Sequence, residues 1–322
     1  MRILRIFFIA VLVILLAGLP FITGRDNLIN LVILIFLYVI LASSWNILGG
    51  FTGQTSLGHA AYFGLGSLIT RLLWTGGFPL FASLLAGSVV AVLFALLIGV
   101  PAFRLKGVYF AIGTLALAQI LNITVGNVFP AISSLPIDML ATYQLLPRYF
   151  LFFAIAILTI LSTYLLVNSK WGLGIMAVRE EEDAAESLGV SALRHKLLAL
   201  TLSAYFTGLA GGAFAYYHVS YYYQFPFLPV WSFDALTMVY IGGQGTIIGP
   251  IIGAIFFVFL REYLALNLGE YHLIVFGVLF ILVVLFLPGG IVEAWEKLQK
   301  AFSRRSMMKK SKMQSDHIEP TS

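Results

Sequence analysis

Ionisable side chains, the residues that could do chemistry, gather in one stretch of this chain. Residues 168–196 hold five of the fourteen acidic residues, together with Lys170, Arg179, Arg194 and Lys196. No catalytic or phosphate-binding pattern accompanies them: the sequence contains no GxxxxGK(S/T), HExxH or GxSxG, and its five histidines are scattered. The sequence therefore predicts neither an ATPase site nor a metal site in this chain. The charged stretch is better suited to contact another protein.

The segment 177–188 contains neither glycine nor proline, so we expect a short helix there. Its acidic residues fall in the early turns, where the helix dipole stabilises negative charge. Gly189 is predicted to end this helix and Ser191 to begin the next one. Small residues on one face would let the helix fit a groove of a partner; the alternative is a solvated surface helix. The predicted docking residues are Arg179, Glu182, Asp183, Ala184, Ala185, Leu188 and Gly189, with Ala184, Ala185 and Leu188 forming the docking face.

The composition of the chain indicates that lipid covers most of its surface. Of the 322 residues, 60% are hydrophobic and only 10% are charged, and the mean hydropathy is +0.98. A soluble domain carries about 25% charged residues. The net charge of +5 does not indicate nucleic acid, because the basic residues lie beside apolar runs and in the tail. The sequence has no cysteine.

A bilayer is crossed by about 20 apolar residues in a helix, and the sequence predicts ten such spans. They lie near 6–23, 28–48, 56–74, 79–100, 107–128, 149–167, 197–218, 232–247, 248–264 and 271–288. The eighth and ninth are either two short helices or one long broken helix. The first is read as a membrane helix, with a cleaved signal peptide as the alternative.

The basic residues favour ten crossings with the N- and C-termini in the cytoplasm. That topology leaves outside only Arg25, Arg71, Arg148 and Arg261, of which we expect Arg71 to reach the membrane interface. The expected fold is an all-α polytopic membrane protein. Residues 1–296 form its transmembrane domain, with the cytoplasmic loop 168–196, and residues 297–322 form a basic, disordered cytoplasmic tail.

Two glycine-rich runs, 49–59 and 242–250, interrupt apolar segments in the two halves of the chain. Such interruptions are typical of transport pathways lined by backbone polar groups, although glycine also permits close helix packing. The role of the polar loop 129–148 stays open between a pore cap, a partner contact and a simple connector. The predicted pathway residues are Gln54, Thr55, Ser56, His59, Tyr109, Phe110, Thr114 and Gln244.

Charge is sparse within the predicted spans, which argues against ion-coupled transport. Asp234 follows Ser232 near the start of the eighth span. We expect Ser232 to cap that helix and Asp234 to occupy its first turn, a capping role preferred over ion binding. The energy for a transport cycle would then come from outside the chain.

Several motifs resemble the permeases of branched-chain amino-acid ABC importers of the LivM type. Residues 183–189 (DAAESLG) are similar to the EAA-x3-G motif of importer permeases, with Asp183 in place of the first glutamate. The wider pattern covers nearly the whole chain. It comprises 46–66 (NILGGFTGQTSLGHAAYFGLG), 104–111 (RLKGVYFA), 177–185 (AVREEEDAA), 239–250 (VYIGGQGTIIGP) and 287–290 (LPGG). The sequence departs from this family at 129–136 (FPAISSLP), where a Thr-Gly-Gly-x-x-Gly run is usual.

The resemblance implies a permease subunit of an ATP-driven importer in the bacterial inner membrane, surrounded by lipid. Its partners would be two ATP-binding subunits, which hydrolyse ATP, a second related permease and an external solute-binding protein. The loop at 183–189 would be the coupling helix that inserts into an ATP-binding subunit. The solute stays open among branched-chain amino acids, other small amino acids, urea and short amides, as does pairing with a second copy. A stand-alone channel or secondary carrier is the alternative from another class.

Overall fold

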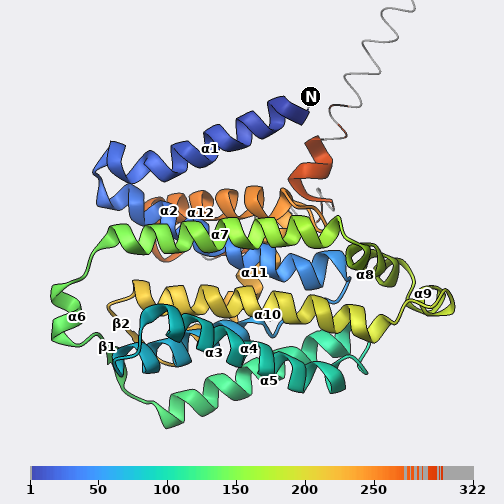
Figure 1. Cartoon of the computed structure of the whole chain (residues 1–322), viewed down its shortest axis with the longest axis horizontal. Coiled ribbons are helices and arrows are strands. Elements are labelled where there is room, and N and C mark those ends of the chain that lie inside the picture. The colour runs from blue at the N-terminus through green and yellow to red at the C-terminus, as the bar shows by residue number, and fades with distance from the viewer. Residues whose placement is uncertain are drawn as a thin grey trace, which may run out of the picture.

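The computed structural model describes residues 2–271 and, beyond them, residues 274–275, 277–278, 281–282, 285, 289–295, 297 and 299. The predicted tenth span and the basic tail therefore lie largely outside the described residues. Figure 1 shows an elongated bundle of helices. The helices are α1 (Arg2–Thr23), α2 (Asp26–Asn46), α3 (His59–Thr75), α4 (Leu80–Ala102), α5 (Val108–Val128), α6 (Ile137–Ala141), α7 (Leu145–Val167), α8 (Lys170–Glu180), α9 (Glu182–Ser187), α10 (Ala192–Tyr217), α11 (Val230–Gly242) and α12 (Gly249–Leu268).

Shorter elements complete the described chain. A π-helical turn, Ile47–Phe51, continues α2, and two 3₁₀ turns cover Phe225–Phe227 and Gly269–Tyr271. The strands β1 (Ile132–Ser134) and β2 (Ser220–Tyr222) pair in antiparallel register, with Ser133 opposite Tyr221. These strands and α6 lie at one end of the molecule, here called the strand end, and α8 and α9 lie at the other, the loop end (Figure 1).

Six described helices are long and apolar enough to cross a membrane, so the chain is a multi-pass membrane protein. These segments are Asp26–Phe51, Leu80–Ala102, Val108–Val128, Leu145–Val167, Ala192–Tyr217 and Gly249–Leu268. The predicted eighth and ninth spans are two separate helices, α11 and α12, divided at 243–248. Residues 56–58 precede the first residue of α3, so the third helix begins later than predicted.

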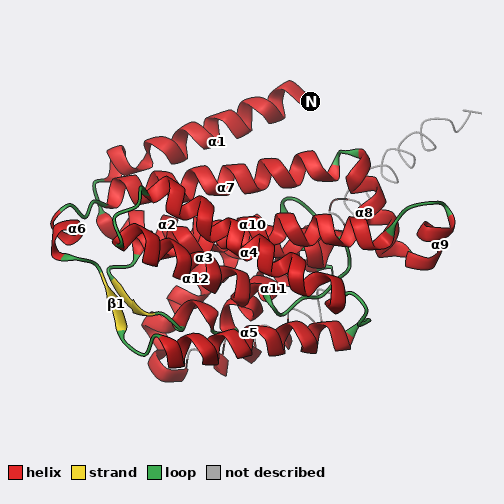
Figure 2. Cartoon of the chain, turned by 60° about the horizontal axis from the view of Figure 1, so that its bottom comes forward, coloured by secondary structure: helices red, strands yellow, loops and turns green. Residues whose placement is uncertain are grey.

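The centre of the bundle is built on α10, which packs against α2, α3, α4 and α7 (Figure 2). Small residues permit this close approach. A Cβ atom added at Gly66 of α3 would collide with the backbone of Gly208 on α10. Without a hydrophobic drive between helices in lipid, such contacts supply the packing attraction. On the other side, the ring of Phe36 on α2 meets that of Tyr149 on α7 edge-on, at 5.5 Å between centroids.

The Arg71 side chain does not extend to the surface of the protein, as a side chain reaching out to the membrane interface would. Its side chain is fully buried at the strand end, and all five of its N–H groups donate hydrogen bonds. The acceptors are the Ser133 hydroxyl and the backbone carbonyls of Ser133, Ala215, His218 and Val219, at 2.7–3.2 Å. The end of α10 exposes carbonyls without helical partners, and Arg71 satisfies them while tying β1 to the segment that leads from α10 into β2.

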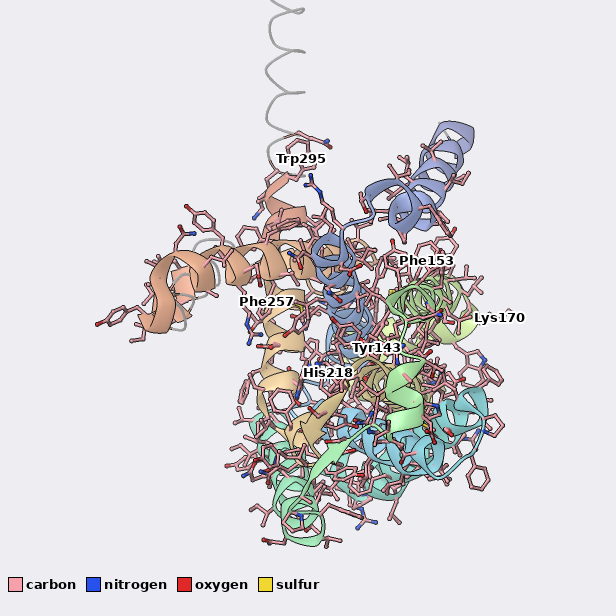
Figure 3. All side chains as sticks on the ribbon, turned by 90° about the vertical axis from the view of Figure 1, so that its left-hand side faces the viewer. Tyr143, Phe153, Lys170, His218, Phe257 and Trp295 are labelled. Atoms are coloured by element: carbon pink, nitrogen blue, oxygen red, sulfur yellow. The ribbon has the colours of Figure 1, made fainter. Side chains whose placement is uncertain are left out.

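His218 lies beside this arginine at the end of α10. Its ring packs against Phe214 at 3.9 Å between centroids, and burial lowers its pKa to about 4. Figure 3, viewed from the strand end, places His218 and Tyr143 near the middle of this face. The Tyr143 hydroxyl donates a hydrogen bond to the carbonyl of Tyr217 at 3.0 Å. The residues after α10 are thus fastened both to the strands and to the segment before α7.

The predicted capping roles of Ser232 and Asp234 are wrong. The helix α11 begins at Val230, two residues before Ser232, whose hydroxyl instead accepts a hydrogen bond from the Ala60 amide at 2.8 Å. The Asp234 carboxylate pairs with Arg261 of α12 at 3.1 Å and accepts a hydrogen bond from the Tyr38 hydroxyl at 3.2 Å. The carboxylate therefore joins α11, α12 and α2, and its charge is balanced within the membrane domain.

Candidate functional site at the loop end

The charged loop contains two short helices instead of the single helix expected over 177–188. The backbone of Glu181 is extended (φ −157°, ψ 109°) and separates α8 from α9. The Ser169 hydroxyl caps α8 by accepting a hydrogen bond from the Gly172 amide at 3.2 Å. In Figure 1, α9 is the outermost helix of the loop end. The break turns α9 away from α8, a change of direction that a continuous helix would not permit.

The end of α9 is closed by two backbone hydrogen bonds that involve the residues after it. The Gly189 amide donates to the Glu186 carbonyl at 2.9 Å, and the Val190 amide donates to the Ala185 carbonyl at 3.0 Å. Gly189 has φ +86°, a conformation that L side chains rarely adopt. Ser191 then precedes the first residue of α10. The predicted end of this helix at Gly189 and the predicted start of the next at Ser191 agree with the structure.

The three residues of the predicted docking face do not share one exposed surface. Ala185 is buried in a small apolar cluster with Val178 and Ala192, which fastens α9 to α8 and α10. Ala184 is exposed, and Leu188 has 85% of its surface exposed. In so short a helix, the turn at Glu181 decides which positions point inward, and spacing along the sequence does not reveal it. The surface available to a partner contains Ala184 and Leu188 but not Ala185.

Charged residues of the loop have distinct environments. Glu182 pairs with the buried ammonium group of Lys196 on α10, at 2.6 Å between Oε2 and Nζ. Asp183 is exposed in the first turn of α9, where its carboxylate faces the positive end of the helix dipole. Arg179 is in the last turn of α8, with part of its side chain exposed and part of it lying against the glycine-rich runs. Glu182 therefore holds the loop together, and Asp183 is free to face a partner.

The two glycine-rich runs meet each other at the loop end. The Asn46 side-chain amide bonds to both backbone groups that face it: Nδ2 donates to the Thr246 carbonyl at 2.8 Å, and Oδ1 accepts from the Gly245 amide at 2.9 Å. Nε2 of Gln244 donates to the Gly49 carbonyl at 2.8 Å. These bonds join the π-helical turn after α2 to the connection between α11 and α12.

Gly289 and Gly290 pack on the connection between α11 and α12. A Cβ atom added at Gly290 would lie 2.6 Å from the amide nitrogen of Gly243, and Gly289 contacts the same residue. The motif 287–290, which belongs to the family pattern in the sequence, therefore contributes its two glycines to this contact.

The eight predicted pathway residues have different environments in this chain. Tyr109 is 74% exposed at the start of α5, and Gln54 and Thr55 are partly buried near the loop end. Gln244 is engaged with Gly49, as described. Phe110 and Thr114 instead face the interior, where they line a cavity of about 10 Å³ with Gly58 and Tyr62. That volume holds about one water molecule.

Ser56 and His59 belong to a buried polar network between α2, α3 and α10. The Ser56 carbonyl accepts a hydrogen bond from Nε1 of Trp45 at 2.7 Å. The Ser203 hydroxyl donates to the Ser44 carbonyl at 2.7 Å, so Nε2 of His59, 2.7 Å from that hydroxyl, is the donor of their bond. Thr114 similarly accepts a bond from the Leu57 amide at 3.0 Å. These side chains fix the backbone of residues 52–58, and their position favours a structural role.

Sequence reasoning missed Asn46, Lys196 and Arg71 as contact residues. Asn46 immediately precedes the first glycine-rich run, a position from which a side-chain amide can satisfy backbone groups that lack helical partners. Arg71 occupies an otherwise apolar stretch, and a cation there requires acceptors inside the protein. Lys196 follows Arg194 and His195, and the sequence does not distinguish the buried Lys196 from the exposed Arg194. The distances that join these residues to partners up to 200 positions away are tertiary information.

Comparison with known proteins identifies the class. Residues 27–284 match the model of a family described as the permease component of branched-chain amino acid transport systems. The chain is 28% identical over 89% of its length to the high-affinity branched-chain amino acid transport system permease protein LivM of Escherichia coli, covering 75% of that protein. The values for the Salmonella typhimurium protein of the same name are identical. A probable branched-chain amino acid transport permease protein LivM of Methanocaldococcus jannaschii is 24% identical over 83% of this chain and 93% of its own length. No solved structure matched.

The helical bundle, the charged loop and these matches together define a multi-pass membrane permease. The chain belongs to the family of permease components of branched-chain amino acid transport systems.

Proposed function

We propose that this chain is the membrane-spanning subunit of an ATP-driven importer that carries branched-chain or related small amino acids inward by alternating access. The family match over residues 27–284 supports the transport role, and the names of the relatives support this class of solute. Energy would come from partner subunits, because the sequence has no phosphate-binding loop of its own. The partners would be two ATP-binding subunits, a second related permease and an external solute-binding protein.

The observation that carries the coupling role is the exposed tip of the loop. Leu188, 85% exposed, and the neighbouring Ala184 form a small apolar surface outside the apolar spans, bordered by the carboxylate of Asp183. A small convex surface of this kind fits a groove on a soluble subunit. The ion pair and the Ala185 cluster hold the tip in place, so a force on the tip is passed to α8 and α10.

The topology of ten crossings, with both termini in the cytoplasm of a bacterial cell, belongs to this proposal. Its support is that α1 begins on the side of the loop end and that Gly289 and Gly290 pack at the same end (Figure 1). Single cysteines at Ser134, which is exposed, and at Ser315 test it, because the native chain has none. An impermeant thiol reagent added outside intact cells should label the first and spare the second. External labelling at position 315 would overturn the topology.

Reconstitution tests the function directly. The chain, co-expressed with its ATP-binding subunits and second permease, should take up radiolabelled leucine into proteoliposomes only with ATP and the solute-binding protein. A secondary carrier would instead require an ion gradient, and a channel would equilibrate leucine without either. A panel of amino acids, urea and acetamide offered to the solute-binding protein identifies the solute. Failure to co-purify any ATP-binding subunit would contradict the importer proposal.

A further inference from the structure

Arg179 contacts both glycine-rich runs at once. A Cβ atom built at Gly53 of the first run would lie 3.2 Å from Cγ of Arg179 and 3.7 Å from its Cβ. At Gly245 of the second run, a Cβ atom would collide with Nη1 of the same arginine. The stem of Arg179 therefore crosses Gly53 while its guanidinium group covers Gly245, and the absence of a side chain at both positions, each with positive φ, lets the arginine lie close to the backbone.

The surface beneath this arginine is a single unit made from distant parts of the chain. The bonds of Asn46 and Gln244 join the turn after α2 to the connection between α11 and α12. Gly290 packs on Gly243 of that connection. A side chain at the end of α8 thus touches, at one point, a unit that includes the ends of three membrane helices.

The rest of the loop has a different connection to the membrane domain. The ion pair between Glu182 and Lys196 attaches α9 to α10, and α8 follows directly after α7 in the sequence. Among the described contacts of the loop, those of Arg179 lead to α2, α11 and α12. Arg179 gives the loop a direct contact with this unit, in addition to the indirect route through α10, which packs on α2.

We propose that Arg179 is a positioning residue that makes the α8–α9 loop and the two glycine-rich runs move as one unit. Displacement of the loop by an ATP-binding subunit is thereby passed to α2, α11 and α12. The inference rests on the proposed function, but it gives Arg179 a role that differs from docking: the arginine acts on the permease itself. Its stem and planar guanidinium group fit the two glycines, a shape that lysine does not reproduce.

Substitution in the full transporter tests this role. In Arg179→Ala, the ATP-binding subunits should co-purify at the wild-type level and hydrolyse ATP, while leucine uptake per ATP falls at least tenfold. Arg179→Lys should fall similarly, because charge alone does not replace the contacts. Arg194→Ala is the matched control, since it removes an exposed arginine of the same loop and should behave like the wild type. Normal uptake by Arg179→Ala, rescue by lysine, or loss of the ATP-binding subunits in Arg179→Ala would each overturn the proposal.

A cross-link provides an independent test. The distance of 3.7 Å between the two Cβ positions suits a disulfide, whose Cβ atoms lie about 3.5–4.5 Å apart. In the double variant Gly53→Cys/Arg179→Cys, uptake should be low under reducing conditions and should recover when oxidation joins the two residues. Gly53→Cys alone, which should not respond to oxidation, controls for strain at φ +75°.

Failure of the disulfide to form would contradict the geometry, and formation without recovery of uptake would contradict the role. These results differ from a failure of the proposed function. In that case, even the wild-type chain would lack ATP-binding subunits or ATP-dependent uptake.

Discussion

Lys196 on α10 and Glu182 on α9 form an ion pair with 2.6 Å between Nζ and Oε2. The lysine side chain is 5% exposed and the glutamate side chain 33%, so the two partners differ in their access to water. A buried cation without a partner costs more than a carboxylate that water can reach. The pair therefore holds α9 against α10. Most of the free-energy cost of breaking it comes from leaving the buried lysine without a partner.

This asymmetry predicts the outcome of removing each partner. Glu182→Gln should lower the free energy of unfolding by about 1–3 kcal/mol, because it strands the buried ammonium group. Lys196→Met should cost less, and the double variant should resemble Lys196→Met. Thermal unfolding of the detergent-solubilised complex measures all three. Additive losses would show that the two residues do not interact.

Arginine at the two alanines of α9 should have different effects. Ala184→Arg alters the exposed tip, so the permease should keep its melting temperature but lose its ATP-binding subunits on co-purification. Ala185→Arg places a charge in the cluster with Val178 and Ala192, so it should destabilise the loop itself. Limited proteolysis within 177–192 should be faster only in the second variant. Equal proteolysis of both would contradict the burial pattern.

Loss of Arg71 should loosen the strand end. Arg71→Gln removes most of five hydrogen bonds that satisfy carbonyls after α10, at a cost of about 3 kcal/mol or more. Amide hydrogen exchange of β1 and β2 should rise relative to the loop end. Arg25→Gln is the control, because Arg25 is exposed and makes no side-chain capping bond. Unchanged exchange in Arg71→Gln would refute the bracing role of this arginine.

The burial of His218 predicts sensitivity of the protein to acid. Burial lowers the pKa of this imidazole from 6.5 to about 4, so between these values the unfolded chain binds a proton that the folded chain does not. The free energy of unfolding should therefore fall as the pH drops from about 6.5 to about 4, by up to about 1.4 kcal/mol per pH unit. Melting temperatures of the wild type and His218→Gln, measured at pH 7.5 and 5, test this. The variant should lose less stability in acid.

The sequence predicted most helices because the apolar runs are long and the interruptions are marked by glycine, proline and charge. The positions of α2, α4, α5, α7 and α10 follow from those runs, and Gly189 marks the end of α9. The capping role assigned to Ser232 was wrong because side-chain type suggests a cap without revealing where the helix starts. Ser232 instead bonds to Ala60, a residue 172 positions away.

By itself, the sequence determined that this protein spans a membrane and that one charged loop stands apart from the apolar spans. These follow from local composition, which decides whether a segment prefers lipid or water. Only the tertiary structure decided that Ala185 is buried and Leu188 exposed, that every N–H group of Arg71 donates a hydrogen bond, and that the glycine-rich runs meet beneath Arg179. Such contacts depend on which groups the fold brings within a few ångströms, and spacing along the chain does not encode that distance.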